Sequence, residues 1–273
     1  MNPTWNAIAR EAALAAEHLG SGATILGKAN YAHHAHYGQA FFSLSTGFER
    51  AAKLAFVIDH ALVNAGSFPS NEELRTYGHK LDQLLDRADA IAERRQLVDI
   101  RLPRSDIHNG IVTVLTEFAN NITRYYNLDF VTGNPRAAQR DDPTKAWFQM
   151  VVQPVLKKHY GARQQEKHRR NAEVIAALLQ PAALVRHTAE TGEPLETVFD
   201  ASLQTGITEF AQPYVRMYVL QLVRFIGGLL GELGYANYEV RLDTIPHLSE
   251  FFAIFNNEDE YFLNRKTWSI YRP

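Results

Sequence analysis

Apolar residues recur along most of this chain at intervals of three and four, which is the spacing of one face of an α-helix. The clearest stripe begins at Phe41 and ends at Leu62. Because the same segment carries apolar residues on a second side, we expect this helix to lie at the centre of the fold. The stripe consists of Phe41, Leu44, Phe48, Ala51, Ala55, Ile58 and Leu62.

Glycine, proline and capping residues divide this pattern into separate helices. The segment NAGSFPSNEE ends the central helix, and Gly78 separates a short helix from a longer one. Pro103 prevents the longer helix from continuing, and Ser105 or Asp106 caps the next one. The predicted apolar face of that next helix carries Ile107, Ile111, Val114, Phe118, Ile122 and Tyr125.

The clearest linker is DFVTGNPRAAQRDDPTK, which has a glycine, two prolines and few apolar residues. We therefore expect an all-α protein with a helical bundle over residues 1–130 and a second helical lobe over 131–273, divided near residues 130–143. One strand is predicted, at NYEVRLD. Beyond the linker the pattern predicts helices near residues 145–160, 163–189, 195–205, 207–234, 246–256 and 259–266.

Composition narrows the functional classes. The chain has 273 residues, a net charge of −2 and no cysteine, which excludes disulfides and thiolate catalysis. Near-neutral charge means that any contact with nucleic acid must come from a local basic patch. The most apolar segment, YVLQLVRFIGGLLGELGY, is interrupted by glycines, Arg224 and Glu232 and predicts no membrane span. With no export signal at its start, the sequence predicts a cytoplasmic protein without membrane contact.

The stretch RLPRSDIH places Arg101, Arg104 and His108 around a predicted helix start. In the first turn of a helix, exposed N–H groups attract anions and disfavour a protonated imidazole, so an exposed His108 there would be suited to act as a base. A guanidinium beside it binds phosphate through a planar fork. The simpler interpretation is that Ser105 caps the helix while the arginines and His108 face water.

Three segments in order resemble the HEPN family of small helical-bundle proteins: LSTGFERAAKLAFVIDH, FPSNEELRTYGHKLDQLL and RLPRSDIHNGIVTVLTEFANNITRYYNLDF. The resemblance covers about residues 31–130. It implies a metal-independent ribonuclease of a bacterial toxin or phage-defence system, with four to six residues between a catalytic Arg and a catalytic His. Arg101 and His108 fit this spacing, although Leu102 stands where the family often has a polar residue. The resemblance also implies a homodimer with a shared cleft, no cofactor or metal, and an antitoxin or defence-system partner.

A basic run, KKHYGARQQEKHRR, follows the linker and holds six Lys or Arg residues and one Glu. Arg163, Lys167 and Arg170 share one helical face, and we predict that they bind RNA phosphates together with Arg104. The alternatives are a solvated helix face, or a face that binds the acidic segment 239–260 in the same or another protomer. Tyr125 and Tyr126 are suited either to stack on bases or to pack in the core.

Three smaller features complete the pattern. His33 and His36 have the spacing of shared metal ligands, but no carboxylate lies nearby, so polar or packed histidines at a helix start are the favoured interpretation. Glu49 and Lys53 predict an ion pair between successive turns of the central helix. His79 is expected to begin a packed helix.

The sequence therefore predicts an endoribonuclease acting through Arg101 and His108. The alternative is a non-catalytic helical binding module for a protein or an RNA partner. The absence of RNA cleavage together with tight binding of a partner would favour the second function.

Overall fold

The computed structural model describes residues 2–120, 122–135 and 141–270. About 71% of the structure is helical, and one two-stranded sheet accompanies the helices in these ranges. The all-α class predicted from the sequence is therefore confirmed. In the first half the helices are α1 (Pro3–Leu26), α2 (His34–Val63), α3 (Asn71–Thr76), α4 (Leu81–Arg94), α5 (Asp106–Ala119) and α6 (Tyr126–Val131).

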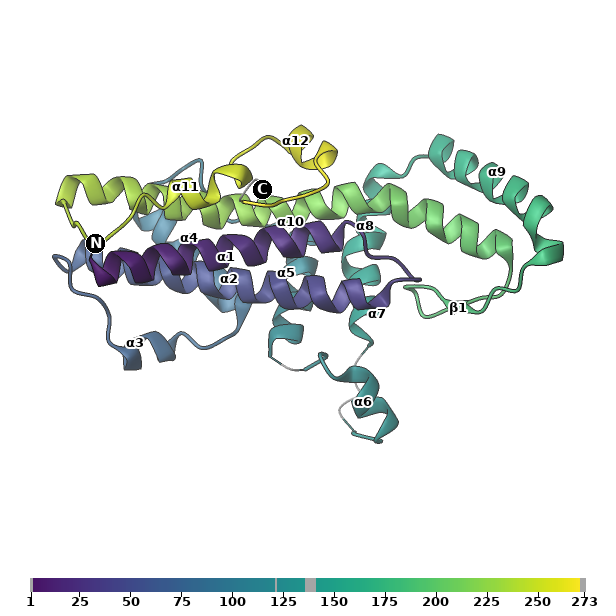
Figure 1. Cartoon of the computed structure of the whole chain (residues 1–273), viewed down its shortest axis with the longest axis horizontal. Coiled ribbons are helices and arrows are strands. Elements are labelled where there is room, and N and C mark those ends of the chain that lie inside the picture. Colours follow the sequence, from purple (N-terminus) through teal and green to yellow (C-terminus); the bar gives the residue numbers. More distant parts are fainter. Residues whose placement is uncertain (1, 121, 136–140, 271–273) are drawn as a thin grey trace.

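The second half of the chain contains one very long helix. α10 (Val198–Val240) runs beside α1 and α2 along the long axis of the molecule (Figure 1). The other elements are α7 (Pro143–Trp147), a π-helical turn (Phe148–Val152), α8 (Gln153–His159), α9 (Ala162–Leu179), a 3₁₀ turn (Gln180–Ala182), β1 (His187–Thr188), β2 (Pro194–Leu195), α11 (Ser249–Phe252), a 3₁₀ turn (Ala253–Phe255) and α12 (Asp259–Asn264).

α2 is the central helix, as predicted. Its apolar stripe is buried from Phe41 to Ile58, and α1, α4, α5 and α10 all pack against it. Two glycines bring α1 and α2 close together. A Cβ atom at Gly22 would lie 2.7 Å from Leu44, and one at Gly47 would lie 2.8 Å from Leu19. These two contacts need glycine, because real Cβ atoms do not approach so closely.

A single buried cluster includes residues from both sides of the predicted division near residues 130–143. Leu44 of α2 and Leu229 of α10 both belong to it. α6 projects from this body of packed helices (Figure 1). The predicted apolar face of α5 stops short, because the helix ends at Ala119, and Tyr125 is exposed instead of packed in the core.

The boundaries predicted beyond the linker were partly wrong. α10 continues through residues 205–207, where a break was expected, and it also contains most of the predicted strand. It ends at Val240 and is capped by Arg241, which adopts a left-handed conformation (φ +54°), and the Asn237 side chain bonds the backbone of Leu242. α9 ends at Leu179, ten residues earlier than expected, and the 3₁₀ turn follows it, because Pro181 has no backbone N–H with which to continue an α-helix.

α10 is also the one described helix that is long and apolar enough to span a membrane by composition. Within its most apolar 18-residue window, 78% of the residues are buried inside the protein. Its apolar surface is therefore used in packing against the other helices.

Candidate functional site

The two arginines of the RLPRSDIH stretch are held by one carboxylate of α4. Arg101 donates from Nε and Nη2 to the two Asp89 oxygens, at 2.8 and 3.1 Å. Arg104 lies 3.3 Å from Asp89 and 3.0 Å from Asp86, and the Leu102 backbone N–H donates to Asp89 at 3.0 Å. Hydrogen bonding from Arg101 is the main cause that lowers the pKa of Asp89 to about 2. These contacts fix the stretch against α4.

His108 is buried, with 5% of its surface exposed, so the expectation of a largely exposed histidine was wrong. The reason is that the first turn of α5 faces α10, where the ring of Tyr218 meets the imidazole edge-on at 5.2 Å. Burial is the main cause that lowers the pKa of His108. Of the two capping residues that the sequence allowed, Ser105 is the N-cap.

Both ring nitrogens of His108 have partners. Nδ1 lies 2.7 Å from the Ser105 hydroxyl, and the Ser105 backbone N–H donates to it at 3.3 Å. Nε2 lies 2.7 Å from Oε1 of Gln221, which can only accept. The network therefore assigns a neutral imidazole with its proton on Nε2.

The hydrogen bonds continue from His108 towards the end of the chain. Gln221 donates from Nε2 to Asp259 at 2.8 Å, and Asp259 lies 3.2 Å from the Arg224 guanidinium. Arg224 also donates to the backbone carbonyl of Asn257 at 2.7 Å. The network therefore joins α5, α10 and α12. The side-chain nitrogen and oxygen atoms of His108 and Gln221 are all hydrogen-bonded within it.

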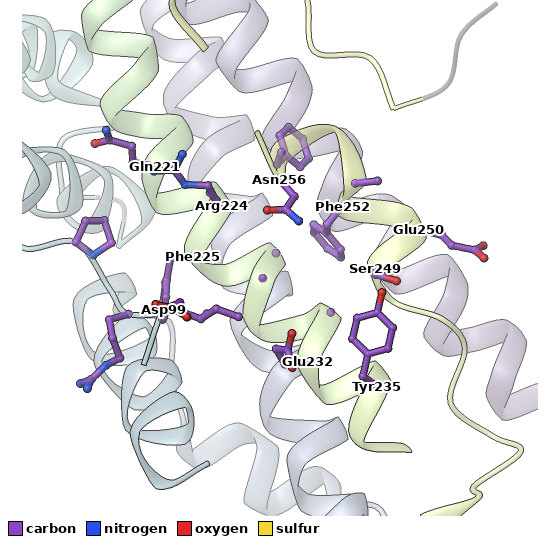
Figure 2. A pocket seen from close by; sticks show the side chains of 18 residues that line it. Asp99, Gln221, Arg224, Phe225, Glu232, Tyr235, Ser249, Glu250, Phe252 and Asn256 are labelled. Carbon is purple, nitrogen blue, oxygen red and sulfur yellow. The ribbon is translucent and has the colours of Figure 1, made fainter. Parts of the chain in front are cut away.

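A groove with a volume of about 700 Å³ lies beside this network, between residues 99–103, α10 and α11 (Figure 2). We call it the α10 groove. Arg101, Gln221 and Arg224 line it, whereas His108 does not and lies one hydrogen bond behind Gln221. Figure 2 shows the Tyr235 side chain of α10 pointing towards Ser249 on the opposite wall.

Three carboxylates also line the α10 groove: Asp99, Glu232 and Glu250. None of them forms an ion pair with a described residue. Arg101 and Arg224, in contrast, are both neutralised by carboxylates outside the lining. The groove therefore presents negative charge.

The floor of the α10 groove is formed by glycines of α10. A Cβ atom at Gly228 would lie 3.5 Å from Ile100, and one at Gly231 would lie 3.6 Å from Ser249, which are ordinary contacts. Neither glycine is thus required by packing within the described fold, although glycine lowers helix stability by about 1 kcal/mol relative to alanine. The two residues keep the floor of the groove open.

The structure places the predicted phosphate-binding residues on two separate surfaces. Arg163, Lys167 and Arg170 lie together on α9, as predicted, and Arg170 pairs with Glu166 at 2.6 Å. α9 packs on α10 at the end of the molecule far from α11 (Figure 1). These three residues are therefore not brought together with Arg101, Arg104 and His108.

The smaller predictions have mixed outcomes. Lys53 and Glu49 form the predicted ion pair at 2.9 Å. The expectation that His79 begins a packed helix was wrong: its side chain is 71% exposed and lies 2.8 Å from Glu49, because α4 begins only at Leu81. His33 and His36 stack on each other at 5.3 Å, and the described residues contain no group of three or more His, Asp or Glu that could hold a metal ion.

Sequence reasoning missed Asp89 and Gln221. A signal for Asp89 existed, because Leu85, Asp89 and Ala92 occupy the same face of a helix whose other residues there are apolar. A carboxylate at such a position needs a buried partner. Gln221 gave no comparable signal, since a single uncharged polar residue in an apolar helix is compatible with many environments.

No protein-family model matches this chain, and it has no significant match among the curated proteins or the solved structures. The resemblance to HEPN proteins thus stays a prediction from the sequence segments.

Proposed function

We propose that this protein is a non-catalytic helical binding module that holds a basic segment of a partner protein in the α10 groove. The observation that carries the proposal is the charge asymmetry of the groove. Its arginines are neutralised by Asp89 and Asp259, whereas Asp99, Glu232 and Glu250 have no described cation. A cationic side chain entering the groove would meet these three carboxylates.

The charge distribution favours a basic peptide over RNA. Phosphates bind to sites where cations are available, and each phosphate contact uses a Lys or Arg side chain. Arg101 is engaged by Asp89 through two hydrogen bonds, so binding phosphate would require breaking them. The carboxylates of the groove would in addition repel the phosphate backbone.

The glycine floor supports a peptide ligand. Without side chains at Gly228 and Gly231, a partner backbone could approach α10 closely. Tyr235 stands at the wall with about half of its surface exposed, and exposed aromatic residues are frequent anchors in protein interfaces.

The second candidate function is the ribonuclease activity predicted from the sequence. One observation favours it: Arg101 and Gln221, the partner of His108, line the same groove. Catalysis would require His108 to exchange its hydrogen bond with Gln221 for one to substrate. RNA cleavage in the presence of EDTA that disappears in both Arg101→Gln and His108→Gln would favour this second function.

The proposal is tested by titrating the full-length protein with a fluorescent peptide and measuring anisotropy. The probe is the chain's own segment KKHYGARQQEKHRR, with a control peptide in which its six Lys and Arg residues are Gln. We expect the basic peptide to bind and the neutral one not to bind. The triple variant Asp99→Asn/Glu232→Gln/Glu250→Gln should weaken binding by about tenfold or more, because it removes the carboxylates that face the cations.

A matched triple variant separates the groove from net charge. Glu17→Gln/Glu72→Gln/Glu209→Gln removes three exposed carboxylates outside the groove and changes the net charge equally. We expect it to bind the basic peptide like the unmodified protein at 0.15 M salt. Equal weakening in both triple variants, or no binding of the basic peptide at all, would contradict the proposal.

A further inference from the structure

A second cavity, of about 850 Å³, lies where α2 begins and where α5 ends, and the segments that carry α6, α7 and the β1–β2 hairpin complete its wall. It shares no lining residue with the α10 groove. We call it the Arg124 pocket. Phe42, Phe118 and Arg124 form one part of its wall, and Gly38 leaves open space on the α2 side.

Two phenyl rings hold the Arg124 guanidinium. Its Cζ atom lies 5.3 Å from the ring centroid of Phe42 and 5.3 Å from that of Phe118. Such cation–π contacts orient the planar group without using its N–H donors. The guanidinium is therefore held in place at the pocket wall, while its Nη donors form no hydrogen bond or ion pair with the described residues.

Arg124 differs from the other partly buried arginines of the described chain. Arg50 pairs with Glu11, Arg95 with Asp59 and Arg224 with Asp259, and Arg265 donates to Thr267 and Tyr261. Arg124 has neither an ion pair nor a hydrogen bond to a described side chain or carbonyl. Its Nε atom is buried and has no hydrogen-bond acceptor among the described residues. Leaving a buried donor unsatisfied costs about 1–3 kcal/mol, and no described acceptor offsets this cost at Nε, so the position of the guanidinium is not explained by internal hydrogen bonding.

The pocket also contains carboxylates, and each of them is already engaged. Asp141 lies 3.0 Å from Lys145, and Asp142 accepts from the backbone N–H groups of Thr144 and Lys145. Glu190 is buried and accepts hydrogen bonds from the side chains of Tyr37, Gln204 and Thr208. Lys145 is paired with Asp141, whereas Arg124 forms no ion pair with a described residue, so Arg124 is the cation of this lining that is available to an anionic ligand.

We propose that the Arg124 pocket binds a small molecule through a phosphate or carboxylate group, with the Arg124 guanidinium as the anion-binding residue. A guanidinium fork matches the geometry of both oxyanions. The half-exposed ring of Phe42 offers an apolar surface to the body of the ligand, and the cavity has the size that small-molecule sites usually have.

The proposal is tested by isothermal titration calorimetry on the full-length protein. The probes are inorganic phosphate, adenosine 5′-monophosphate and benzoate, with adenosine as the uncharged control. We expect at least one of the three anions to bind and adenosine not to bind. Preference for phosphate and the nucleotide over benzoate assigns a phosphate ligand, and the reverse order assigns a carboxylate ligand.

Three variants locate the binding. Arg124→Gln should weaken it at least about tenfold, because it removes the charged fork. Arg87→Gln is the matched control, since Arg87 also stacks on an aromatic ring, that of Tyr77, but does not line the pocket. Gly38→Leu fills the pocket from α2 without altering Arg124, and it should also abolish binding.

Thermal unfolding of each variant verifies that it folds, and Arg124→Gln should lower the melting temperature only slightly, because two cation–π contacts are lost but no ion pair. The proposal is overturned if none of the three anions binds the unmodified protein, or if Arg124→Gln and Arg87→Gln bind them equally.

Discussion

The Nε2 atom of His108 lies 2.7 Å from the Oε1 atom of Gln221, a residue 113 positions later in the chain. This hydrogen bond joins the first turn of α5 to the middle of α10, and Gln221 passes the connection on to Asp259. The residue that the sequence singled out for catalysis is thus part of a partly buried polar bridge between the two halves of the chain.

The first prediction concerns the contribution of this bridge to stability. His108→Ala should lower the free energy of unfolding by about 2–4 kcal/mol, because it opens a cavity and leaves the amide of Gln221 without its partner. Urea unfolding measures the change. His79→Ala is the control and should change stability by less than about 1 kcal/mol, since that side chain is exposed and its ion pair with Glu49 is at the surface. Equal midpoints for His108→Ala and the unmodified protein would refute the structural role.

The second prediction concerns pH. Because burial lowers the pKa of His108 in the folded protein, protons bind more strongly to the unfolded chain around the ordinary histidine pKa of about 6.5. The stabilising contribution is therefore fully present above about pH 6.5 and declines as the pH falls below it. Urea unfolding at pH 7.5 and 5.5 should show a smaller loss of stability on acidification in His108→Gln than in the unmodified protein.

Other histidines with lowered pKa values, such as His159 and His168, contribute to acid sensitivity in both proteins, so only the difference between them reports on His108. An identical loss of stability on acidification in both proteins would show that His108 takes up its proton equally well in the folded and unfolded chain.

The third prediction concerns Asp89, which holds Arg101, Leu102 and Arg104. Asp89→Asn should lower the free energy of unfolding by about 1–3 kcal/mol, because Asp89 is buried and the substitution weakens its charge-assisted hydrogen bonds to the arginines.

The same carboxylate should make stability depend on pH. The folded-state pKa of Asp89, about 2, lies below the ordinary value, so its contribution to stability is present above about pH 4 and is lost as the pH falls towards 2. Acid titrations followed by circular dichroism should show a flatter curve for Asp89→Asn in this range. Asp86→Asn, at an exposed carboxylate paired with Arg104, is the matched control and should change little.

The features that the sequence predicted correctly depend on local chemistry or on strong periodicity. The cap of α5 could be predicted because Pro103, Ser105 and the apolar repeat that follows lie within a few residues of one another. The burial of α2 follows from apolar residues on more than one side of the helix. Glu49 and Lys53 pair because they are four residues apart on one helix.

The features that could not be predicted depend on contacts between distant segments. The burial of His108 is decided by α10, which no local pattern places beside α5. Residues 237–243 alternate as a strand does, but continuation of a long buried helix determines their conformation up to Val240. The stacking of Arg124 between Phe42 and Phe118 likewise combines residues from separate elements.

The fourth prediction concerns the glycine floor of the α10 groove. Gly228→Ala and Gly231→Ala should each raise the free energy of unfolding by up to about 1 kcal/mol, because alanine is the better helix former and its Cβ atom would make only ordinary contacts of 3.5 and 3.6 Å. Gly20→Ala in α1 is the control and should strongly destabilise the protein, because its Cβ atom would lie 2.0 Å from the carbonyl oxygen of Trp268. Urea unfolding distinguishes the two kinds of glycine. If Gly228→Ala or Gly231→Ala destabilises the protein as Gly20→Ala does, then these glycines serve internal packing, and the open floor no longer supports a ligand in the groove. If both substitutions stabilise the protein but weaken its binding of the basic peptide, then these glycines lower stability in favour of peptide binding.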